Sequence, residues 1–247
     1  MNNINLNLYC NTHSTIDPLH TQANQKTLVN GASLLSDDDR SVCLKKNYIL
    51  DNTFQNISSM NPLLGDLTGL YWLWKNTTDE WVGVNQYCRF YDDDQLKNIN
   101  YDSKTIYVSH FVDFGRANIW EQYSYFHTDL GIKILVKAIE MGTVPITIPM
   151  MERMLEVRQL STCNSFFAHR QLFNKLCEVL FNIIFELYEG VKYCIEYVQL
   201  GSHSGRAHTE KRLLAFMAER ILTLIYYHSS YFLGSNVVIC PVGFYHK

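Results

Sequence analysis

The sequence feature that most restricts the fold is the stretch from residue 61 to residue 91, which combines large aromatic side chains with polar ones. It holds three of the four tryptophans, beside several charged and hydrogen-bonding groups. A plain core segment would be apolar throughout, and a solvated loop would lack the tryptophans. Large aromatics beside a few polar groups are typical of a small-molecule pocket wall. A core helix and strand with polar groups at the rim is the alternative interpretation.

The chain of 247 residues is long enough for one large domain or two small ones, and no linker rich in Pro, Gly or Ser divides it. We predict one α/β domain over residues 1–247. Residues 1–115 are expected to form a mainly α/β, nucleotide-binding part. Residues 116–247 are expected to be mainly helical.

Charge and cysteine usage exclude several classes of function. The net charge is −3 and no run of basic residues occurs, so nucleic acid is not expected as the main partner. The seven cysteines are scattered and form no CxxC motif, which favours free thiols in a reducing compartment over disulfides or a zinc site. No signal peptide is expected at the start, and no stretch reaches the roughly 18 apolar residues of a spanning helix. We therefore expect a soluble, cytoplasmic protein.

Two predicted strands, over residues 4–10 and 81–84, run directly into polar residues. His13 follows the first strand, and Gln86 and Arg89 follow the second. The carboxyl ends of strands in an open α/β sheet are where ligands bind. These side chains are therefore candidate ligand contacts, although a histidine at a strand end also has purely structural roles.

Periodicity predicts the remaining elements. Helices are expected over 66–76, 120–141, 150–160, 171–189 and 208–228. A strand is expected over 104–109, a strand or strand-like loop over 161–169, and a brief extended piece over 146–149. Residues 14–50 show no such pattern and are expected to be irregular, and the tail 237–247 yields no prediction.

Three further polar residues stand in settings that call for a partner. Asn56 lies in a loop, 51–58, whose residues either bond their own backbone or present amides and hydroxyls to a nucleotide or sugar. Asn164 lies among small and aromatic residues, where a buried amide without partners costs about 1–3 kcal/mol. Arg220 falls in the middle of the apolar side of the last helix, so it must meet either an internal carboxylate or an anionic ligand.

Several stretches of the chain resemble one bacterial family. The matching runs are GDLTGLYWLWKN (65–76), VGVNQYCRFY (82–91), CNSFFAHRQLFNKLCEVLFNIIFEL (163–187) and SGRAHTEKRLLAFMAERILTL (204–224). The resemblance covers essentially the whole chain in order. The family is found in capsule and lipopolysaccharide gene clusters and is associated with galactofuranosyltransferases. It implies an α/β fold of the GT-A-like, nucleotide-sugar-binding type with a helical C-terminal half.

The family motif is matched with substitutions in its most polar part. Asp66 stands where the family usually has Glu, Gln86 replaces a His, Cys88 replaces the first Arg of a pair, and Arg89 keeps the second. The acidic triplet 92–94 invites comparison with the metal-binding DxD of sugar-nucleotide transferases, with a solvated turn as the alternative. The family signature does not depend on a DxD, so no metal ligand is assigned, and a requirement for Mn²⁺ or Mg²⁺ is left open.

The resemblance implies an inverting glycosyltransferase that moves galactofuranose from a UDP-sugar to a cell-surface glycan. A lipid-linked glycan acceptor would favour peripheral contact with the inner membrane. Transfer needs a carboxylate that deprotonates the acceptor, with Asp66 as the first choice and Glu219 as the second. The candidates for binding the diphosphate are Arg89, Arg220 and Lys75, and the candidates for contacting the base, ribose or sugar are His13, Asn56, Gln86 and Asn164.

Two alternatives stay open at this point. The substitutions at Gln86 and Cys88 motivate a catalytically idle homologue that acts as a binding subunit in polysaccharide assembly. A hydrolase or phosphotransferase using the same carboxylates is the other. It is less favoured, because neither a phosphate-cradling glycine-rich loop nor a nucleophile elbow occurs in the sequence.

Overall fold

The computed structural model describes residues 4–192 and 212–246. Its strands are β1 (Leu6–Thr12), β2 (Gln25–Val29), β3 (Ile49–Leu50), β4 (Trp81–Gln86), β5 (Arg89–Tyr91), β6 (Thr105–Ser109), β7 (Phe111–Asp113), β8 (Gln159–Ser161), β9 (Phe166–His169), β10 (Val238–Val242) and β11 (Phe244–His246). Its α-helices are α1 (Asp37–Lys45), α2 (Asn61–Leu64), α3 (Leu67–Asn76), α4 (Asp93–Asn98), α5 (Ile119–Phe126), α6 (Leu130–Glu140), α7 (Ile148–Arg153), α8 (Arg170–Lys192), α11 (Leu213–Tyr227) and α12 (Ser229–Phe232). Short 3-10 helices are η1 (Ala32–Leu34), η2 (Ser58–Met60) and η3 (Met154–Glu156).

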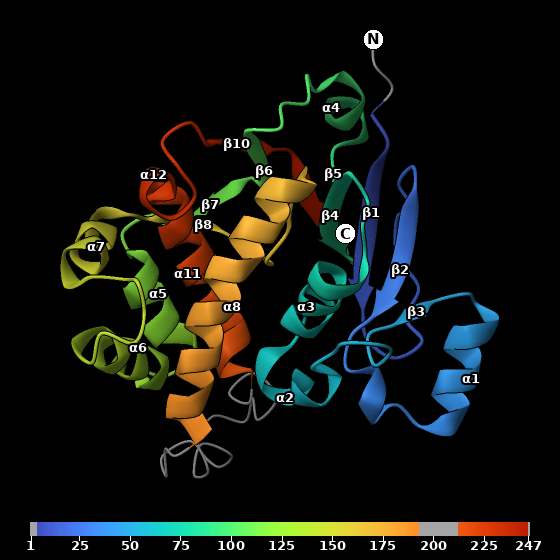
Figure 1. Cartoon of the computed structure of the whole chain (residues 1–247), viewed down its shortest axis with the longest axis horizontal. Coiled ribbons are helices and arrows are strands. Elements are labelled where there is room, and N and C mark those ends of the chain that lie inside the picture. The colour runs from blue at the N-terminus through green and yellow to red at the C-terminus, as the bar shows by residue number, and fades with distance from the viewer. Residues whose placement is uncertain (1–3, 193–211, 247) are drawn as a thin grey trace.

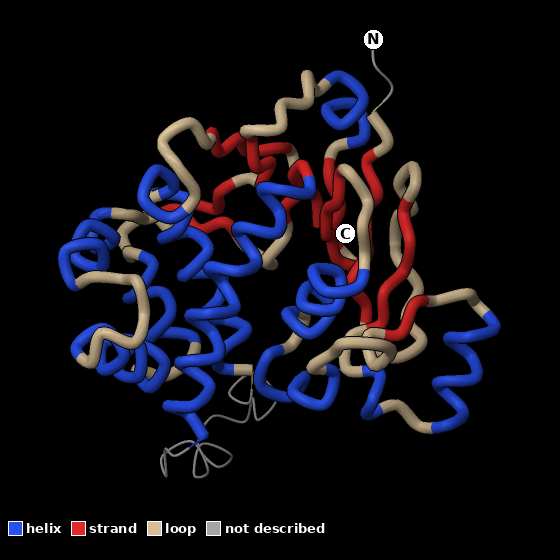
Figure 2. Tube along the Cα trace, in the orientation of Figure 1, coloured by secondary structure: helices blue, strands red, loops and turns tan. Residues whose placement is uncertain are grey.

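A mixed, mainly parallel sheet forms the centre of the molecule. Its strand order is β10-β6-β9-β4-β1-β2-β3, with β5 and β11 paired beside β4. Strands β1, β2, β3 and β4 are parallel, and β9 runs antiparallel between β4 and β6. Strand β10, near the C-terminal end of the chain, pairs with β6. It therefore lies in the same sheet as β1, near the N-terminal end. Figure 2 shows these strands gathered together, with most helices on one side of the view.

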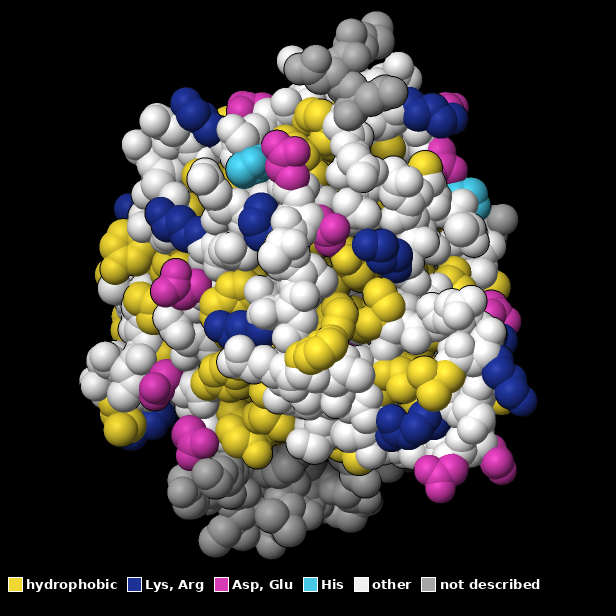
Figure 3. Space-filling model, turned by 45° about the vertical axis from the view of Figure 1, so that its right-hand side comes forward, with side chains coloured by type: hydrophobic (Ala, Val, Ile, Leu, Met, Phe, Trp, Pro, Cys, Tyr) yellow, Lys and Arg dark blue, Asp and Glu magenta, His cyan; other side chains and the backbone are white. Residues whose placement is uncertain are grey.

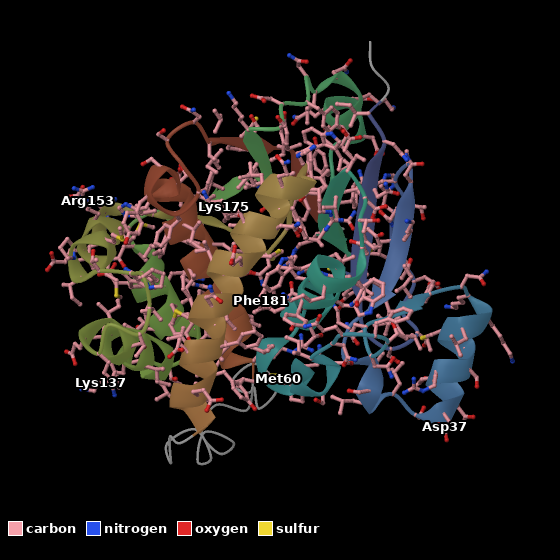
Figure 4. All side chains as sticks on the ribbon, in the orientation of Figure 1. Asp37, Met60, Lys137, Arg153, Lys175 and Phe181 are labelled. Carbon is pink, nitrogen blue, oxygen red and sulfur yellow. The ribbon has the colours of Figure 1, made fainter. Side chains whose placement is uncertain are left out.

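Helices α3 and α8 lie in front of the sheet in Figure 1, and α11 runs behind α8. Helix α8 is amphipathic: its apolar face packs against α3, α6, α11 and the sheet, whereas Asn174, Glu178 and Asn182 on its other face are exposed. Phe181, labelled in Figure 4, is fully buried and stacks on the Trp74 ring of α3 with centroids 5.6 Å apart. Tyr71 meets the same phenylalanine edge-on at 5.2 Å. These contacts fix α3 against α8.

The predicted fold class is confirmed. The expected strands at 4–10, 81–84 and 104–109 are β1, β4 and β6, and the helices expected at 66–76 and 171–189 are α3 and α8. Their patterns were strong because each element buries one continuous apolar face or run. The helix expected over 208–228 corresponds to α11 from Leu213 onward, and its first four expected positions lie outside the described residues.

The expectation of irregular structure over 14–50 was wrong. This segment holds β2, α1 and β3. Helix α1 buries only Cys43, so it has almost no apolar periodicity. The sequence signal for this helix lies at its N-terminus. The Ser36 hydroxyl accepts a hydrogen bond from Asp39 N, and three aspartates occupy the first turn. Strand β2 is defined by its pairing with β1 rather than by its own pattern.

Three other predicted elements, over 120–141, 146–149 and 150–160, also differ from the structure. The helix expected over 120–141 is two helices, α5 and α6, separated at His127, where the backbone is not helical. The pieces expected over 146–149 and 150–160 are α7 and η3, with Thr147 capping α7. The strand or strand-like loop expected over 161–169 consists of the end of β8, a turn and β9. The tail, for which no prediction was made, forms β10 and β11, whose partners are distant in sequence.

Candidate functional site

A cavity of about 370 Å³ opens where β1 and β4 end, beside the N-terminus of α3. The two strand ends are neighbours, since Asn11 pairs with Gln86 in the parallel register. The cavity is lined by Asn11, Thr12, His13, Asn30, Asn61, Gly65, Asp66, Gln86, Tyr87, Cys88, Arg89, Cys163, Asn164, Arg212, Ala215, Phe216 and Glu219. Polar side chains dominate this lining. The position agrees with the expected ligand site at the carboxyl edge of the sheet.

Asp66 stands at the N-terminal end of α3 and faces this cavity. Gly65 before it has φ +53° and ψ −130°, a backbone conformation open essentially to glycine alone, and this turn separates α2 from α3. The Asp66 carboxylate does not cap the helix. It accepts hydrogen bonds from Gln86 Nε2 at 3.0 Å and from Asn164 Nδ2 at 3.2 Å. Side chains from two other parts of the chain therefore fix its position.

Burial, and to a smaller extent the nearby charge of Glu219, raise the pKa of Asp66 to about 6. The hydrogen bonds from Asn164 and Gln86 act in the opposite direction because they stabilise the ionised form. A carboxyl group with a pKa near 6 is both ionised at neutral pH and basic enough to accept a proton. Asp66 can thus serve as a general base.

The turn between β8 and β9 shapes the wall opposite α3. Cys163 and Asn164 both have positive φ, +71° and +49°, which is uncommon for residues other than glycine. This backbone turns the Asn164 amide towards Asp66 and the Cys163 carbonyl towards Gln86 Nε2, 3.0 Å away. Arg89 NH1 in turn donates to Gln86 Oε1 at 3.1 Å. Strained backbone maintained by surrounding contacts is typical of functional sites.

Glu219 and Arg220 of α11 form an ion pair at the inner side of the cavity. Glu219 Oε2 lies 2.7 Å from Arg220 NH1, and its Oε1 accepts from Cys163 N at 2.6 Å. Arg220 is fully buried, donates to Phe216 O at 2.8 Å and also bonds Gln122 Oε1. Both carboxylate oxygens of Glu219 are therefore engaged. Of the two partners foreseen for Arg220, the structure shows the internal carboxylate.

Two basic side chains and an exposed histidine complete the lining. Arg212 reaches over Gly65, where its Cδ is 3.8 Å from the position of an added Cβ. His13 packs edge-on against Tyr87 with ring centroids 5.3 Å apart. Burial and the Arg212 charge lower the pKa of His13, so the imidazole is neutral at physiological pH. Arg89 and Arg212 are thus the cations that this cavity offers among the described residues.

The structure brings six of the nine predicted site residues to the cavity: His13, Asp66, Gln86, Arg89, Asn164 and Glu219. Their assigned roles stay predictions. The other three do not line it. Lys75 lies 3.2 Å from the centroid of the Trp74 ring, and Arg220 is buried behind Glu219. Asn56 donates to Phe54 O and accepts from Ser58 N, so its amide stabilises the loop.

Four residues that line the cavity were not predicted from the sequence: Asn11, Asn30, Asn61 and Arg212. Asn11 lies inside the polar end of β1, where a signal was available, since His13 was chosen from the same strand end. Asn30 directly follows β2 and would have been found had β2 been recognised. Arg212 stands just before α11, and only the approach of this helix end to Gly65 brings it to the cavity.

The acidic triplet 92–94 is not part of this cavity. Asp92 caps α4 and accepts from Tyr245, Asp93 lies 2.6 Å from His20 Nε2, and Asp94 pairs with Lys97 at 3.2 Å. Within the described ranges, no group of three or more His, Cys, Asp and Glu side chains is arranged to hold a metal ion.

The family model described as domain of unknown function (DUF4422) matches residues 7–230. The chain belongs to this family. No match was found among curated proteins. Among solved structures, the DUF4422 chain is similar to the apo structure of WbbM, a bifunctional glycosyltransferase, with a TM-score of 0.68 and 19% identity. The similarity covers 98% of this chain and 45% of that one, so the chain spans less than half the length of WbbM. At this identity it shows a shared fold.

The DUF4422 chain has no helix, among its described residues, that is long and apolar enough to cross a membrane. On the face seen in Figure 3, lysine and arginine side chains lie dispersed among acidic and uncharged ones. That face therefore offers no concentrated basic surface for a polyanion such as nucleic acid.

Proposed function

We propose that this DUF4422 protein is an inverting glycosyltransferase that uses a nucleotide sugar as its donor. The observation that carries the proposal is Asp66. Its carboxylate faces a polar cavity at the carboxyl edge of the sheet, fixed by Gln86 and Asn164, and has a pKa raised to about 6. The glycosyltransferase fold shared with WbbM supports the same reaction class.

In the proposed reaction, the oxygen of an acceptor hydroxyl attacks the anomeric carbon of the donor sugar. The bond between this carbon and the diphosphate oxygen breaks, and the nucleoside diphosphate leaves with the electron pair. The hydroxyl proton passes to the Asp66 carboxylate. A single displacement of this kind inverts the anomeric configuration.

We assign the base to Asp66 rather than to Glu219 because their carboxylates have different partners. Both Glu219 oxygens are occupied, one by the Cys163 amide and one by the Arg220 guanidinium. Neither oxygen of Glu219 is therefore left without a partner to receive the proton of an acceptor hydroxyl. Asp66 has only neutral amide partners among the described residues, so it keeps its basicity.

The departing diphosphate needs positive charge or hydrogen-bond donors near it. Arg89 and Arg212 line the cavity and are suited to this role through their planar donor groups. Lys75 and Arg220 are not proposed for it, because the first is stacked on Trp74 and the second is paired behind Glu219.

By the family resemblance, we propose UDP-galactofuranose as donor and a cell-surface glycan as acceptor, extended on the cytoplasmic side. A lipid-linked glycan would bring the protein to the inner membrane surface. The 92–94 carboxylates lie outside the cavity and have protein partners, so we do not propose them as ligands of Mn²⁺ or Mg²⁺.

The test is a transfer assay with UDP-galactofuranose, UDP-galactose and UDP-glucose, each offered with a panel of galactose-terminated acceptors, with and without Mn²⁺. We expect a glycosylated product from at least one UDP-sugar, with NMR showing inverted anomeric configuration. A retained configuration would contradict the single displacement, and free sugar formed without acceptor would indicate a hydrolase.

A second candidate function rests on two residues of the cavity. Gln86 and Cys88, which replace the His and first Arg of the family motif, both line the cavity close to Asp66. If these replacements abolish turnover, the protein is a nucleotide-sugar-binding subunit of a polysaccharide assembly complex. Micromolar binding of UDP without transfer of any sugar is the result that favours this alternative.

A further inference from the structure

Three asparagines that line the cavity, Asn11, Asn30 and Asn164, have side-chain oxygens without a hydrogen-bond partner among the described residues. The NH₂ group of Asn164 donates to Asp66, which leaves Asn11 and Asn30 to be explained. Asn11 and Asn30 are 5% and 8% exposed, and the Oδ1 atom of each is buried and unpaired. A buried amide oxygen without a donor costs free energy, so this arrangement calls for a reason. Both residues line the cavity, at the ends of the neighbouring parallel strands β1 and β2.

The reason lies in Gly69 of α3, which both oxygens approach. A Cβ added at Gly69 would lie 2.0 Å from Asn30 Oδ1 and 2.8 Å from Asn11 Oδ1. The two oxygens thus fill the space of a side chain at this position. The Cα–H groups of glycine are weakly positive and favour an oxygen over an amide NH₂ group as neighbour. Gly69 therefore orients both amides with the oxygen towards α3.

With the oxygens turned to α3, the NH₂ group is the end of each amide that is left to face the cavity. Neither Nδ2 atom donates a hydrogen bond to another described residue. Among the described residues, Asn11 and Asn30 thus each offer the cavity an NH₂ donor group without a protein partner, whereas their acceptor atoms are buried. Such a pair selects a group that accepts hydrogen bonds without donating them.

The start of α3 adds positive potential at the same place. No side chain caps this ten-residue helix, because the Asp66 carboxylate is bonded by Gln86 and Asn164 instead. Gly65 and Asp66, which precede the helix, line the cavity. An uncapped helix N-terminus favours an anion, and the free asparagine amides supply donors to hold it. Arg212, reaching over Gly65, contributes a full positive charge.

We propose that Asn11 and Asn30, oriented by Gly69, bind a phosphate group of the nucleoside diphosphate donor at the N-terminus of α3. The inference rests on the proposed function and assigns part of the donor to residues that its reaction scheme does not use. Asn11 and Asn30 act as binding residues, and Gly69 acts as a positioning residue through them.

The experiment compares binding of UDP, inorganic pyrophosphate and uridine by calorimetry in the presence of EDTA. We expect Asn11→Ala and Asn30→Ala each to weaken UDP and pyrophosphate by about tenfold, since hydrogen bonds to charged oxygens are removed. Uridine binding is expected to stay unchanged. Asn30→Asp, which keeps the shape and adds a negative charge, is expected to weaken pyrophosphate more than Asn30→Ala does. Asn98→Ala on α4 is the control at an exposed asparagine.

Gly69→Ala tests the positioning role. It is expected to weaken pyrophosphate as strongly as the asparagine variants, because the added methyl displaces both amides. The matched control is Gly190→Ala on α8, where an added Cβ meets only a methyl group of Ile134 at 2.9 Å. Both changes replace a helical glycine by alanine and raise helix propensity by a similar amount. A larger loss of pyrophosphate affinity in Gly69→Ala than in Gly190→Ala is therefore caused by the displaced asparagine amides.

Unchanged pyrophosphate affinity in the folded variants would overturn the subsite, as would a loss confined to uridine. A wild type that binds neither UDP nor pyrophosphate would overturn the subsite and the nucleoside diphosphate donor together. Transfer activity separates the two proposals. If the wild type transfers sugar but the variants bind pyrophosphate as tightly as the wild type, only the phosphate subsite is rejected. If the wild type shows no transfer but the variants lose affinity for pyrophosphate and not for uridine, only the transferase function is rejected.

Discussion

Asn164 donates its side-chain amide to Asp66 Oδ1 at 3.2 Å, although 98 positions separate the two residues in the chain. Asn164 can do this because its backbone adopts the left-handed conformation, which asparagine tolerates better than most residues. The contact joins the β8–β9 turn to the start of α3. It fixes the carboxylate on which the proposed chemistry depends.

Replacing the proposed base tests its role directly. Asp66→Asn keeps the shape of the side chain and removes its ability to accept a proton. We expect the transfer rate to fall by about 10²–10⁴-fold, the usual contribution of a general base, while UDP affinity is retained. Initial rates and calorimetry measure the two quantities. Asp94→Asn, at a side chain that is 88% exposed, is the control. Full transfer by a folded Asp66→Asn protein would remove Asp66 from the mechanism.

The pH dependence of the reaction should follow the same carboxyl group. Because the base acts when ionised and its pKa is about 6, kcat/KM is expected to rise with pH and level off above about 7. Asn164→Gly removes a donor that lowers this pKa, so it should shift the rise to higher pH, while glycine suits the positive φ of +49°. Asn24→Gly, at an exposed asparagine with φ +54°, is the matched control. An unshifted profile would show that Asn164 does not tune the base.

Asp66 should also make stability depend on pH. Its pKa is raised from 3.8 to about 6 by folding, so between these values the native state holds a proton that the unfolded chain has released. The free energy of unfolding should therefore decrease as pH rises from about 4 to about 6. The decrease is at most about 3 kcal/mol, and water in the cavity makes it smaller. Urea unfolding at several pH values, compared with Asp66→Asn, measures this contribution. If the difference in the free energy of unfolding between the wild type and Asp66→Asn stays constant with pH, this contribution is contradicted.

The buried ion pair of α11 predicts a large effect of breaking it from one side. Arg220→Met leaves Glu219 without its charged partner, and we expect a loss of about 3–5 kcal/mol in the free energy of unfolding. The double variant Glu219→Gln/Arg220→Met should lose less, because no unpaired charge stays behind. Chemical denaturation measures both. Arg153→Met on the outer surface, labelled in Figure 4, serves as control. If the loss of unfolding free energy in the double variant equals the sum of the losses from its two single changes, Glu219 and Arg220 are not coupled.

Part of the site could be predicted because some of its residues follow strong local patterns. His13 and Gln86 were selected as polar residues at the ends of two buried strands, and these ends are neighbours in the sheet. Asn30 was missed because β2 has too few buried residues to show a pattern of its own. Lys75, predicted as a candidate for binding the diphosphate, does not line the cavity, because its side chain stacks on the Trp74 ring.

The sequence by itself determined the α/β class, the principal strands and helices, and the polar ends of β1 and β4, since periodicity reports which face of an element is buried. Only the tertiary structure decided which polar groups meet. It paired Arg220 with its own neighbour Glu219 and brought Asn164 to Asp66. It also placed Asn11 and Asn30 against Gly69. These contacts depend on how distant backbone segments pack, and no local pattern records the distance or direction between two such segments.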